Sequence, residues 1–335
     1  MELETELQKK KEAVEKIIRA YLPKEEGYQS VIMEAMNYSV LRGGKRLRPI
    51  LMAETCKMFS GLDILSQDEK IEASVNVSNS VFGRSASQKN EALYSIAGPL
   101  ERFMAAMEMI HNYSLVHDDL PAMDNDDLRR GKKTTHVVFG EAMGILAGDA
   151  LLNYAYETAA GSFSTWDDEE STLINLRCAK SLSVLSKKSG IYGMVGGQVC
   201  DVNDEGKDIP KGELMFIHEN KTAALIEASM MIGAILAGAK DSDVAEIEKI
   251  ASNIGIAFQI RDDILDVTST DEELGKPVGS DEKNKKVTFV TFEGVEKSEK
   301  EVIDRTNEAI DLMHSLPGQN IFLEQLIFSL AARLK

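Results

Sequence analysis

Hydrophobic residues recur along most of the chain at spacings of three and four, the period of one face of an α-helix. One such stripe contains Phe103, Met107 and Ile110, and a second runs from Ile247 to Phe258. The alternation typical of half-buried strands is scarce, and the VTFVTF stretch at 287–292 has strand-like composition but stands alone. The pattern predicts an all-α protein, built as a single large helical bundle.

Proline and glycine divide this pattern into helices. Pro99 is expected to open a helix, because its missing N–H costs nothing in the first turn. The longest apolar stretch, Leu225–Ala239, contains Glu227 and is too short to span a bilayer. We therefore expect a buried helix there and no stable insertion into a membrane.

One segment, residues 61–98, departs from the helical pattern. Much of it is rich in Ser and Asn and only weakly periodic. Such composition is typical of loops, and long insertions add little to the entropy of loop closure. We predict an inserted surface segment at 61–98 within a single domain that covers residues 1–335.

Composition and charge narrow the classes of function. The chain has 335 residues, 43% of them hydrophobic, and 38 Lys+Arg against 55 Asp+Glu give a formal net charge of −17. This mixture is typical of a soluble globular protein, and so acidic a surface repels nucleic acid. The three cysteines are widely spaced, which excludes a disulfide framework or a zinc motif. The charged N-terminus lacks the apolar core of a signal peptide, so we expect a cytoplasmic protein.

An aspartate-rich stretch follows the first hydrophobic stripe. Residues 118–127 contain five aspartates, and Pro121 disfavours a helix at that point. The helix is therefore expected to end or kink there, with carboxylates at its C-terminal end. The helix dipole is negative at that end, so the cluster favours a bound cation. A solvated acidic turn is the alternative that charge alone leaves open.

A second acidic group lies in the sequence QIRDDILD. Asp262 and Asp266 are four residues apart, which places them on one helix face about 6 Å apart. The two like charges repel each other, and a hard divalent cation would reverse that repulsion. Ordinary ion pairs on an exposed face are the alternative.

Two basic clusters stand out in this acidic chain, at 43–48 (GGKRLR) and 129–133 (RRGKK). Arginine matches phosphate oxygens in bidentate geometry, and glycine lets the backbone approach a ligand closely. The first cluster lacks the glycine spacing and the Ser/Thr of a P-loop, which disfavours nucleotide binding. Acidic and basic clusters together favour a diphosphate ligand that brings Mg²⁺ with it.

These motifs lead to a family. The sequence resembles the trans-polyprenyl diphosphate synthases, of the bacterial farnesyl diphosphate synthase type, over nearly the whole chain except 61–98. The resemblance rests on GGKRLRP (43–49), DDLPAMD (118–124), DDLRRG (126–131), GDALL (148–152), GGQVCD (196–201), KTAALI (221–226), FQIRDDILD (258–266) and LGKPVGSD (274–281).

The resemblance implies a homodimer of the isoprenoid synthase fold, with helices around a deep central cavity. It also implies the reaction. An allylic diphosphate ionises with the help of three Mg²⁺, and the double bond of isopentenyl diphosphate attacks the allylic cation before a proton leaves. An apolar cavity keeps water away from the cation.

The resemblance also assigns roles to individual residues. It implies that Asp118 and Asp124 are the main ligands of two Mg²⁺ and Asp262 that of the third, within a metal-binding set of Asp118, Asp119, Asp124, Asp262, Asp263 and Asp266. Contacts to the allylic diphosphate and to the developing cation are assigned to Arg129, Lys221, Thr222, Gln259 and Lys276. The isopentenyl diphosphate site is assigned to Gly44, Lys45, Arg48, His111 and Arg130.

Tyr113 bears on the length of the product. It lies five residues before Asp118, about 7.5 Å along a helix axis. In the resembling family an aromatic residue there goes with a C15 product, which implies (E,E)-farnesyl diphosphate made from dimethylallyl and geranyl diphosphate. Three alternatives stay open: a geranylgeranyl diphosphate synthase, a class I terpene cyclase, and a regulatory subunit of a heteromeric synthase.

Overall fold

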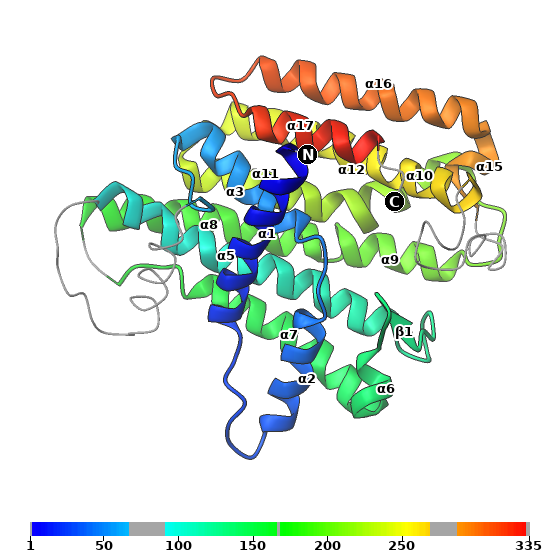
Figure 1. The fold of residues 1–335 in the computed structure, drawn as a ribbon, viewed down its shortest axis with the longest axis horizontal. Helices are drawn as coiled ribbons and strands as arrows, with labels where there is room; N and C mark the ends of the chain where they lie inside the picture. The colour runs from blue at the N-terminus through cyan, green and yellow to red at the C-terminus, as the bar shows by residue number, and fades with distance from the viewer. Residues whose placement is uncertain (1, 67–90, 166–167, 269–286, 333–335) are drawn as a thin grey trace. The chain divides into compact units, whose positions relative to one another are not determined.

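The computed structural model describes residues 2–66, 91–165, 168–268 and 287–332 (Figure 1). They form two compact units, one of Met1–Leu182 with Ile235–Gly238 and one of Ser183–Ala234 with Ala239–Lys335. Each unit is helical, so the prediction of an all-α protein is confirmed. The expectation of one domain over 1–335 stays a prediction. No helix within the described ranges combines the length and apolar character needed to cross a bilayer.

The first unit is organised around one long helix. This helix, α5, packs against α7, α3 and α1, and Figure 1 shows α5 and α7 side by side. The predicted stripe of Phe103, Met107 and Ile110 is fully buried on α5. The helices are α1 (Glu2–Tyr21), α2 (Ser30–Leu41), α3 (Leu47–Ser60), α5 (Glu91–Asp118), α6 (Thr135–Phe139), α7 (Glu141–Ala160) and most of α8 (Glu169–Ser189).

The second unit is built on α12, which packs along α16 (Figure 1). Ile247, Ile250 and Ile254 of the second predicted stripe are buried on α12, and Phe258 is half-buried. The apolar stretch from Leu225 forms a buried helix, as predicted. The elements are α9 (Met194–Asn203), α10 (Lys211–Ile217), η1 (His218–Ala223), α11 (Ala224–Ala237), α12 (Asp241–Thr268), α15 (Phe289–Glu293), α16 (Val295–His314) and α17 (Ile321–Ala332).

Three local features depart from the sequence analysis. Pro99 does not open a helix, because α5 begins at Glu91 and contains the proline. The strand-like residues from Phe289 form the short helix α15, since Thr288 caps it and exchanges hydrogen bonds with Thr291. The described ends of 61–98 are packed, with Ile64 buried and α5 starting at Glu91. Residues 67–90 lie outside the described ranges, so the inserted surface segment predicted at 61–98 stays a prediction.

A β-hairpin interrupts the helices after the aspartate-rich stretch. Its strands are β1 (Leu128–Arg129) and β2 (Lys132–Lys133), paired antiparallel with Arg129 opposite Lys132. Arg130 and Gly131 between them both have positive φ, at 54° and 72°. Positive φ at both central positions is the requirement of a type I′ turn, which matches the twist of the flanking strands. The hairpin therefore places Arg129 at the end of a strand and Arg130 within the sharp turn that follows it.

A buried ion pair ties α1 to α3. Lys10 Nζ lies 2.8 Å from Glu54 Oε1, and the two side chains are 4% and 1% exposed. Glu6, at 3.5 Å, and Asp63, at 3.7 Å, add two further carboxylates to the same ammonium. Glu54 depends on Lys10, because without the ammonium its carboxylate would be left buried and uncompensated.

We expect Lys10→Ala to lower the free energy of unfolding by about 3 kcal/mol or more, since it strands Glu54 in the interior. The exposed pair of Lys249 with Glu246 is the matched control, and Lys249→Ala should change stability by less than about 1 kcal/mol. Urea unfolding followed by circular dichroism measures both. Equal losses in the two variants would contradict the assignment of a buried, interdependent pair.

Candidate functional site

The aspartate-rich stretch forms a tight loop at the end of α5. The helix ends at Asp118, as the sequence predicts. The chain then folds back, because the backbone N–H of Asp124 donates to the carbonyl oxygen of Asp118 over 2.8 Å. The N–H of Asn125 donates to the carbonyl of Leu120 over 3.1 Å. These bonds keep Asp124 near Asp118 at the C-terminal end of α5. Asp118 is half-buried there and Asp124 is exposed.

Asp119 has a different environment from its neighbours. It is fully buried, and its Oδ1 accepts a 2.5 Å hydrogen bond from Arg129 Nε. Arg42, the C-cap of α2, lies 3.6 Å from the other carboxylate oxygen. Burial raises the pKa of Asp119, while the two guanidinium groups oppose that rise. The structure therefore shows Asp119 holding Arg129, whereas its predicted contribution to metal binding stays a prediction.

Residues of α2 fasten the hairpin that carries Arg129. Arg42 Nη1 and Tyr38 Oη both donate to the carbonyl oxygen of Lys133, over 2.9 and 2.7 Å. The Arg42 guanidinium also lies over the Tyr38 ring, 5.5 Å from its centroid. The hairpin is thus fixed at Lys133 by hydrogen bonds and at Arg129 by an ion pair.

The first basic cluster forms a turn between α2 and α3 that contacts the hairpin. Arg130 donates a hydrogen bond to the carbonyl oxygen of Gly43. A Cβ on Gly44 would lie 2.6 Å from Arg130 Nη1, so a side chain there would push the guanidinium from its present position. Lys45, next in the chain, is exposed. The structure thus brings the two predicted basic clusters together, and Gly44 admits a guanidinium where we expected it to admit a ligand.

His111 and Arg48 complete this cluster. Burial lowers the pKa of Arg48 to about 10, and Arg48 Nε finds no hydrogen-bond partner among the described residues. Burial, followed by the charges of Arg48 and Arg130, lowers the pKa of His111 well below its usual value. A neutral imidazole among several cations can receive or donate a hydrogen bond without adding charge. The cluster is suited to an anion of high charge.

Tyr113 is buried one turn before His117 on α5. The two rings meet edge to face, with centroids 5.9 Å apart. Burial, with Tyr156 and Asp118 nearby, raises the pKa of the Tyr113 phenol to about 12, so it is neutral at ordinary pH. Tyr113 is therefore a buried, neutral ring on the helix that ends in the aspartate-rich loop, and its role in limiting product length stays a prediction.

In the second unit, Lys221 and Thr222 lie in a π-helix. η1 spans His218–Ala223, between α10 and α11. Lys221 Nζ pairs with Asp201 Oδ2 at 2.5 Å, and Thr222 Oγ1 donates to Gln259 Oε1 over 2.8 Å. π-helical turns are rare and occur often at functional sites. The extra residue per turn aims successive side chains differently from an α-helix, a feature that the sequence does not reveal.

Two glycines let η1 pack closely. A Cβ on Gly197 of α9 would overlap the backbone nitrogen of Lys221, and one on Gly255 of α12 would overlap Ala223. Backbone atoms cannot yield to such overlap as a flexible side chain can. The second glycine of GGQVCD thus has a packing role that positions Lys221.

The second aspartate group lies on α12, and its member Asp263 accepts hydrogen bonds from other residues of the protein. Asp263 Oδ1 accepts from Gln259 Nε2 over 3.2 Å, and Oδ2 accepts from the backbone N–H of Phe289 over 2.9 Å. Because Gln259 in turn accepts from Thr222, the carboxylate fixes which way the amide faces. Asp262 is half-buried and Asp266 is buried on the same helix. Coordination by these three residues stays a prediction.

The predicted residues fall into two local groups. In the first unit the structure brings together the aspartate-rich loop, Arg129, Arg130, the GGKRLR turn and His111. In the second it joins Lys221, Thr222, Gln259 and Asp263, while Lys276 lies outside the described residues. The sequence analysis gave no role to Arg42 and Asp201, although Arg42 directly precedes GGKRLRP and Asp201 is the last residue of GGQVCD.

The oxygen ligands of the loop suit magnesium. Asp118 and Asp124 offer hard carboxylate oxygens from one end of a helix, which is the ligand type that Mg²⁺ prefers. Among the described residues, no three His, Cys, Asp or Glu side chains converge to form a complete metal site. Mg²⁺ commonly takes one or two protein carboxylates and completes its shell with water and substrate phosphates, so the donor set fits the ion.

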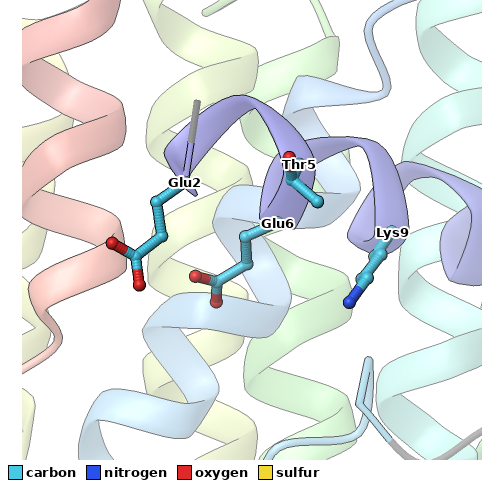
Figure 2. Close-up of a pocket in the computed structure, with 4 residues that line it drawn as sticks. All are labelled: Glu2, Thr5, Glu6 and Lys9. Carbon is cyan, nitrogen blue, oxygen red and sulfur yellow. The ribbon is translucent and has the colours of Figure 1, made fainter.

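A hollow on α1 offers no comparable chemistry. Its lining consists of Glu2, Thr5, Glu6 and Lys9, all from the first turns of one helix. Figure 2 shows the two carboxylates on the same side of the helix and Lys9 further along it. Groups from different elements do not converge there, in contrast to the two groups described above.

His218, the first residue of η1, makes the stability of the folded protein depend on pH. Burial lowers its pKa to about 4, and Nε2 lies 3.6 Å from Asp263 Oδ2. The unfolded chain takes up a proton at its ordinary pKa of about 6.5, which the folded protein resists. Stability from this group is therefore complete above about pH 6.5 and is lost as the pH falls toward 4.

We expect His218→Gln to remove about 2 kcal/mol of the loss in unfolding free energy between pH 7 and pH 5, at about 1.4 kcal/mol per pH unit below 6.5. Urea unfolding without magnesium or substrate measures it. His314→Gln, in a half-exposed residue, is the matched control. Identical pH dependence in the wild type and His218→Gln would show that His218 does not carry the effect.

Comparison with known proteins identifies the family. A family model described as polyprenyl synthetase matches residues 29–316. The farnesyl diphosphate synthase of Geobacillus stearothermophilus is 40% identical over 289 residues, 86% of this chain and 84% of that protein. The geranylgeranyl diphosphate synthase of Cyanophora paradoxa is 40% identical over 298 residues, 89% and 85% of the two.

A solved structure shows the same fold. The geranyltransferase from Helicobacter pylori, complexed with magnesium and isoprenyl diphosphate, superposes with a TM-score of 0.72 at 27% identity, over 98% of this chain and 96% of that one. The all-α isoprenoid synthase fold that the motifs predict is thereby confirmed. On the evidence of sequence and fold together, this chain belongs to the polyprenyl synthetase family and is a prenyltransferase.

Proposed function

We propose that this protein condenses isopentenyl diphosphate with dimethylallyl and geranyl diphosphate to give (E,E)-farnesyl diphosphate. The observation that carries the proposal is the first unit's pairing of an acidic loop with a cationic cluster. Arg129 and Arg130 follow directly on that loop, and Arg130 contacts the turn that carries Lys45 and Arg48. Carboxylates for a metal beside arginines for phosphate match a metal–diphosphate ligand and a second, metal-free diphosphate.

The cationic cluster is assigned to isopentenyl diphosphate. Arg48 has a desolvated guanidinium whose Nε has no hydrogen-bond partner among the described residues, which favours an anionic ligand. Lys45 and Arg130 add exposed positive charge, and neutral His111 adds a hydrogen-bonding group. Gly44 keeps this turn narrow enough for Arg130 to reach it.

The π-helix residues are assigned to the allylic substrate. Lys221 provides an ammonium for the leaving diphosphate, and Asp201 holds it in place at 2.5 Å. Thr222 donates a hydrogen bond to Gln259, so its oxygen lone pairs can face a developing positive charge. Arg129 and Lys276 are proposed as further contacts to the allylic diphosphate. Holding these groups before the reaction avoids reorganising them during it.

Three Mg²⁺ per active site are part of the proposal. The ions, when bound, would neutralise charge on the departing diphosphate oxygen. Asp118, Asp124 and Asp262 are the proposed direct ligands, because Asp124 is exposed and Asp118 and Asp262 are only half-buried, whereas the other three aspartates are buried. The other proposed members of the set act through water or neighbouring groups: Asp119, Asp263 and Asp266.

Product length is the least constrained part of the proposal. The relatives include a farnesyl and a geranylgeranyl diphosphate synthase at the same 40% identity, so the C20 product is a specific alternative. Buried Tyr113 beneath the acidic loop favours C15, because a fixed ring blocks further growth of the chain. A terpene cyclase would need a single diphosphate site, and the Lys45–Arg48 cluster argues against it. A homodimer in the cytoplasm completes the proposal.

Incubation of the purified protein with Mg²⁺, dimethylallyl diphosphate and labelled isopentenyl diphosphate tests the function. We expect label in a C15 prenol after dephosphorylation, and none when EDTA removes the metal, because the carboxylates cannot face a diphosphate without it. A C20 product would select the geranylgeranyl alternative. A cyclic hydrocarbon from farnesyl diphosphate would select the cyclase, and turnover only with an added subunit would select the regulatory role.

We expect Tyr113→Ala to lengthen the main product to C20 or beyond, since it removes a ring that packs edge-on against His117. Chromatography of the dephosphorylated prenols measures chain length. Tyr113→Phe is the matched control, because it keeps the ring and should keep the C15 product. An unchanged product from Tyr113→Ala would place the limit on chain length elsewhere.

A further inference from the structure

We propose that Glu108 is a positioning residue for the isopentenyl diphosphate site and that it acts through Arg46. The inference rests on the proposed function. Glu108 lies on α5, one turn before His111, and is 2% exposed. Its Oε1 lies 2.6 Å from Arg46 Nη1, in an ion pair whose arginine side chain is fully buried. Neither residue was among those that the sequence assigned to the site.

Arg46 is held from three directions. Besides Glu108, its Nε donates to Glu15 Oε1 of α1 over 2.6 Å, and its Nη2 donates to the carbonyl oxygen of Val40 over 2.7 Å. Burial alone would lower the pKa of Arg46, but the two carboxylates outweigh it and raise the pKa. The guanidinium therefore ties α1 and α5 to the chain segment just before α3.

This anchor fixes a strained turn. Arg46 has a φ of 52°, in the left-handed region that non-glycine residues seldom adopt, and Gly43 and Gly44 before it also have positive φ. Such a conformation persists where the surrounding contacts over-determine it. Lys45 lies inside the turn, and Arg48 lies in the first turn of α3 immediately after it. The ion pair of Arg46 thus decides where both proposed phosphate ligands stand.

Glu108 also supplies the negative charge that the cluster needs. Burial lowers the pKa of Arg48 to about 10, and Glu108 is the charge that opposes this lowering. Glu108 opposes the lowering of the Arg130 pKa in the same way. Asn112 donates to Glu108 Oε1 over 3.2 Å and so fixes the carboxylate from its own helix. One buried anion therefore offsets the positive charge of several neighbouring cations.

The matched comparison is Glu54, which is equally buried. It pairs with Lys10 on α1 and belongs to α3, but Lys10 is not a member of the cationic cluster. Glu54→Gln and Glu108→Gln both remove one buried carboxylate charge and keep the side-chain shape. A merely structural role for Glu108 predicts the same consequences for both variants.

Steady-state kinetics and thermal unfolding of the full-length protein distinguish the two roles. We expect Glu108→Gln to raise KM for isopentenyl diphosphate about tenfold or more while KM for dimethylallyl diphosphate stays within about twofold. Glu54→Gln should leave both KM values within about twofold at a similar loss of Tm. Glu108→Asp, which keeps the charge, should recover part of the affinity. Equal rises in both KM values, or equal behaviour of the two Gln variants, would overturn the inference.

Calorimetric binding of isopentenyl diphosphate separates this inference from the proposed function. Weaker binding of isopentenyl diphosphate by Glu108→Gln than by the wild type supports the positioning role, even if the wild type makes no prenyl product. A wild type without product would count against the proposed function alone. A wild type that makes farnesyl diphosphate, with Glu108→Gln binding isopentenyl diphosphate normally, would overturn the inference alone. If Glu108→Gln does not fold, Arg46→Lys gives the same test, because lysine keeps the charge but cannot make all three hydrogen bonds. Normal binding by Arg46→Lys would contradict the proposal.

Discussion

The buried guanidinium of Arg46 is the constraint on which the first unit's site depends. A charge in that position costs several kcal/mol of desolvation unless it is fully paired. Glu15, Glu108 and the carbonyl of Val40 pair it from three elements, so the elements must meet in one arrangement. The turn before α3 can then adopt left-handed geometry. The cations that surround His111 are, on our proposal, placed by an ion pair buried in the interior of the protein.

A second regularity concerns the Asp-Asp pairs of DDLPAMD (118–124) and FQIRDDILD (258–266). In each pair the first aspartate is half-buried and the second is buried and used within the protein. Asp119 holds Arg129, and Asp263 holds Gln259 and the start of α15. Adjacent carboxylates repel each other unless their environments differ. A hydrogen bond from the protein stabilises one carboxylate of each pair, and it orients the groups proposed to contact the diphosphate.

The sequence predicted those features whose cause is local. The 3.6-residue period of Phe103 and Met107 located α5, and Pro121 among aspartates located its end. The sequence did not predict contacts between residues that are distant along the chain. Nothing in the Asp-Asp dipeptide indicates that Asp119 pairs with Arg42. The sequence also did not predict the π-helix at Lys221, because that helix depends on close packing by Gly197 and Gly255. The strands β1 and β2 have two residues each, too few to show an alternating pattern. The prediction that Pro99 opens a helix was wrong, because the proline lies inside α5.

The chemistry and the product length of this protein rest on different residues. Charged motifs from Lys45 to Asp262 identify a prenyltransferase, yet relatives at equal identity carry names with different product lengths. Diphosphate chemistry needs the same charges whatever the length of the tail, so we propose that length is set by apolar packing outside those motifs. Tyr113 meets that condition: it is neutral, buried, and in contact with His117 beside the aspartate-rich loop. A change in such a residue alters the space for a tail while the charges that drive ionisation stay in place.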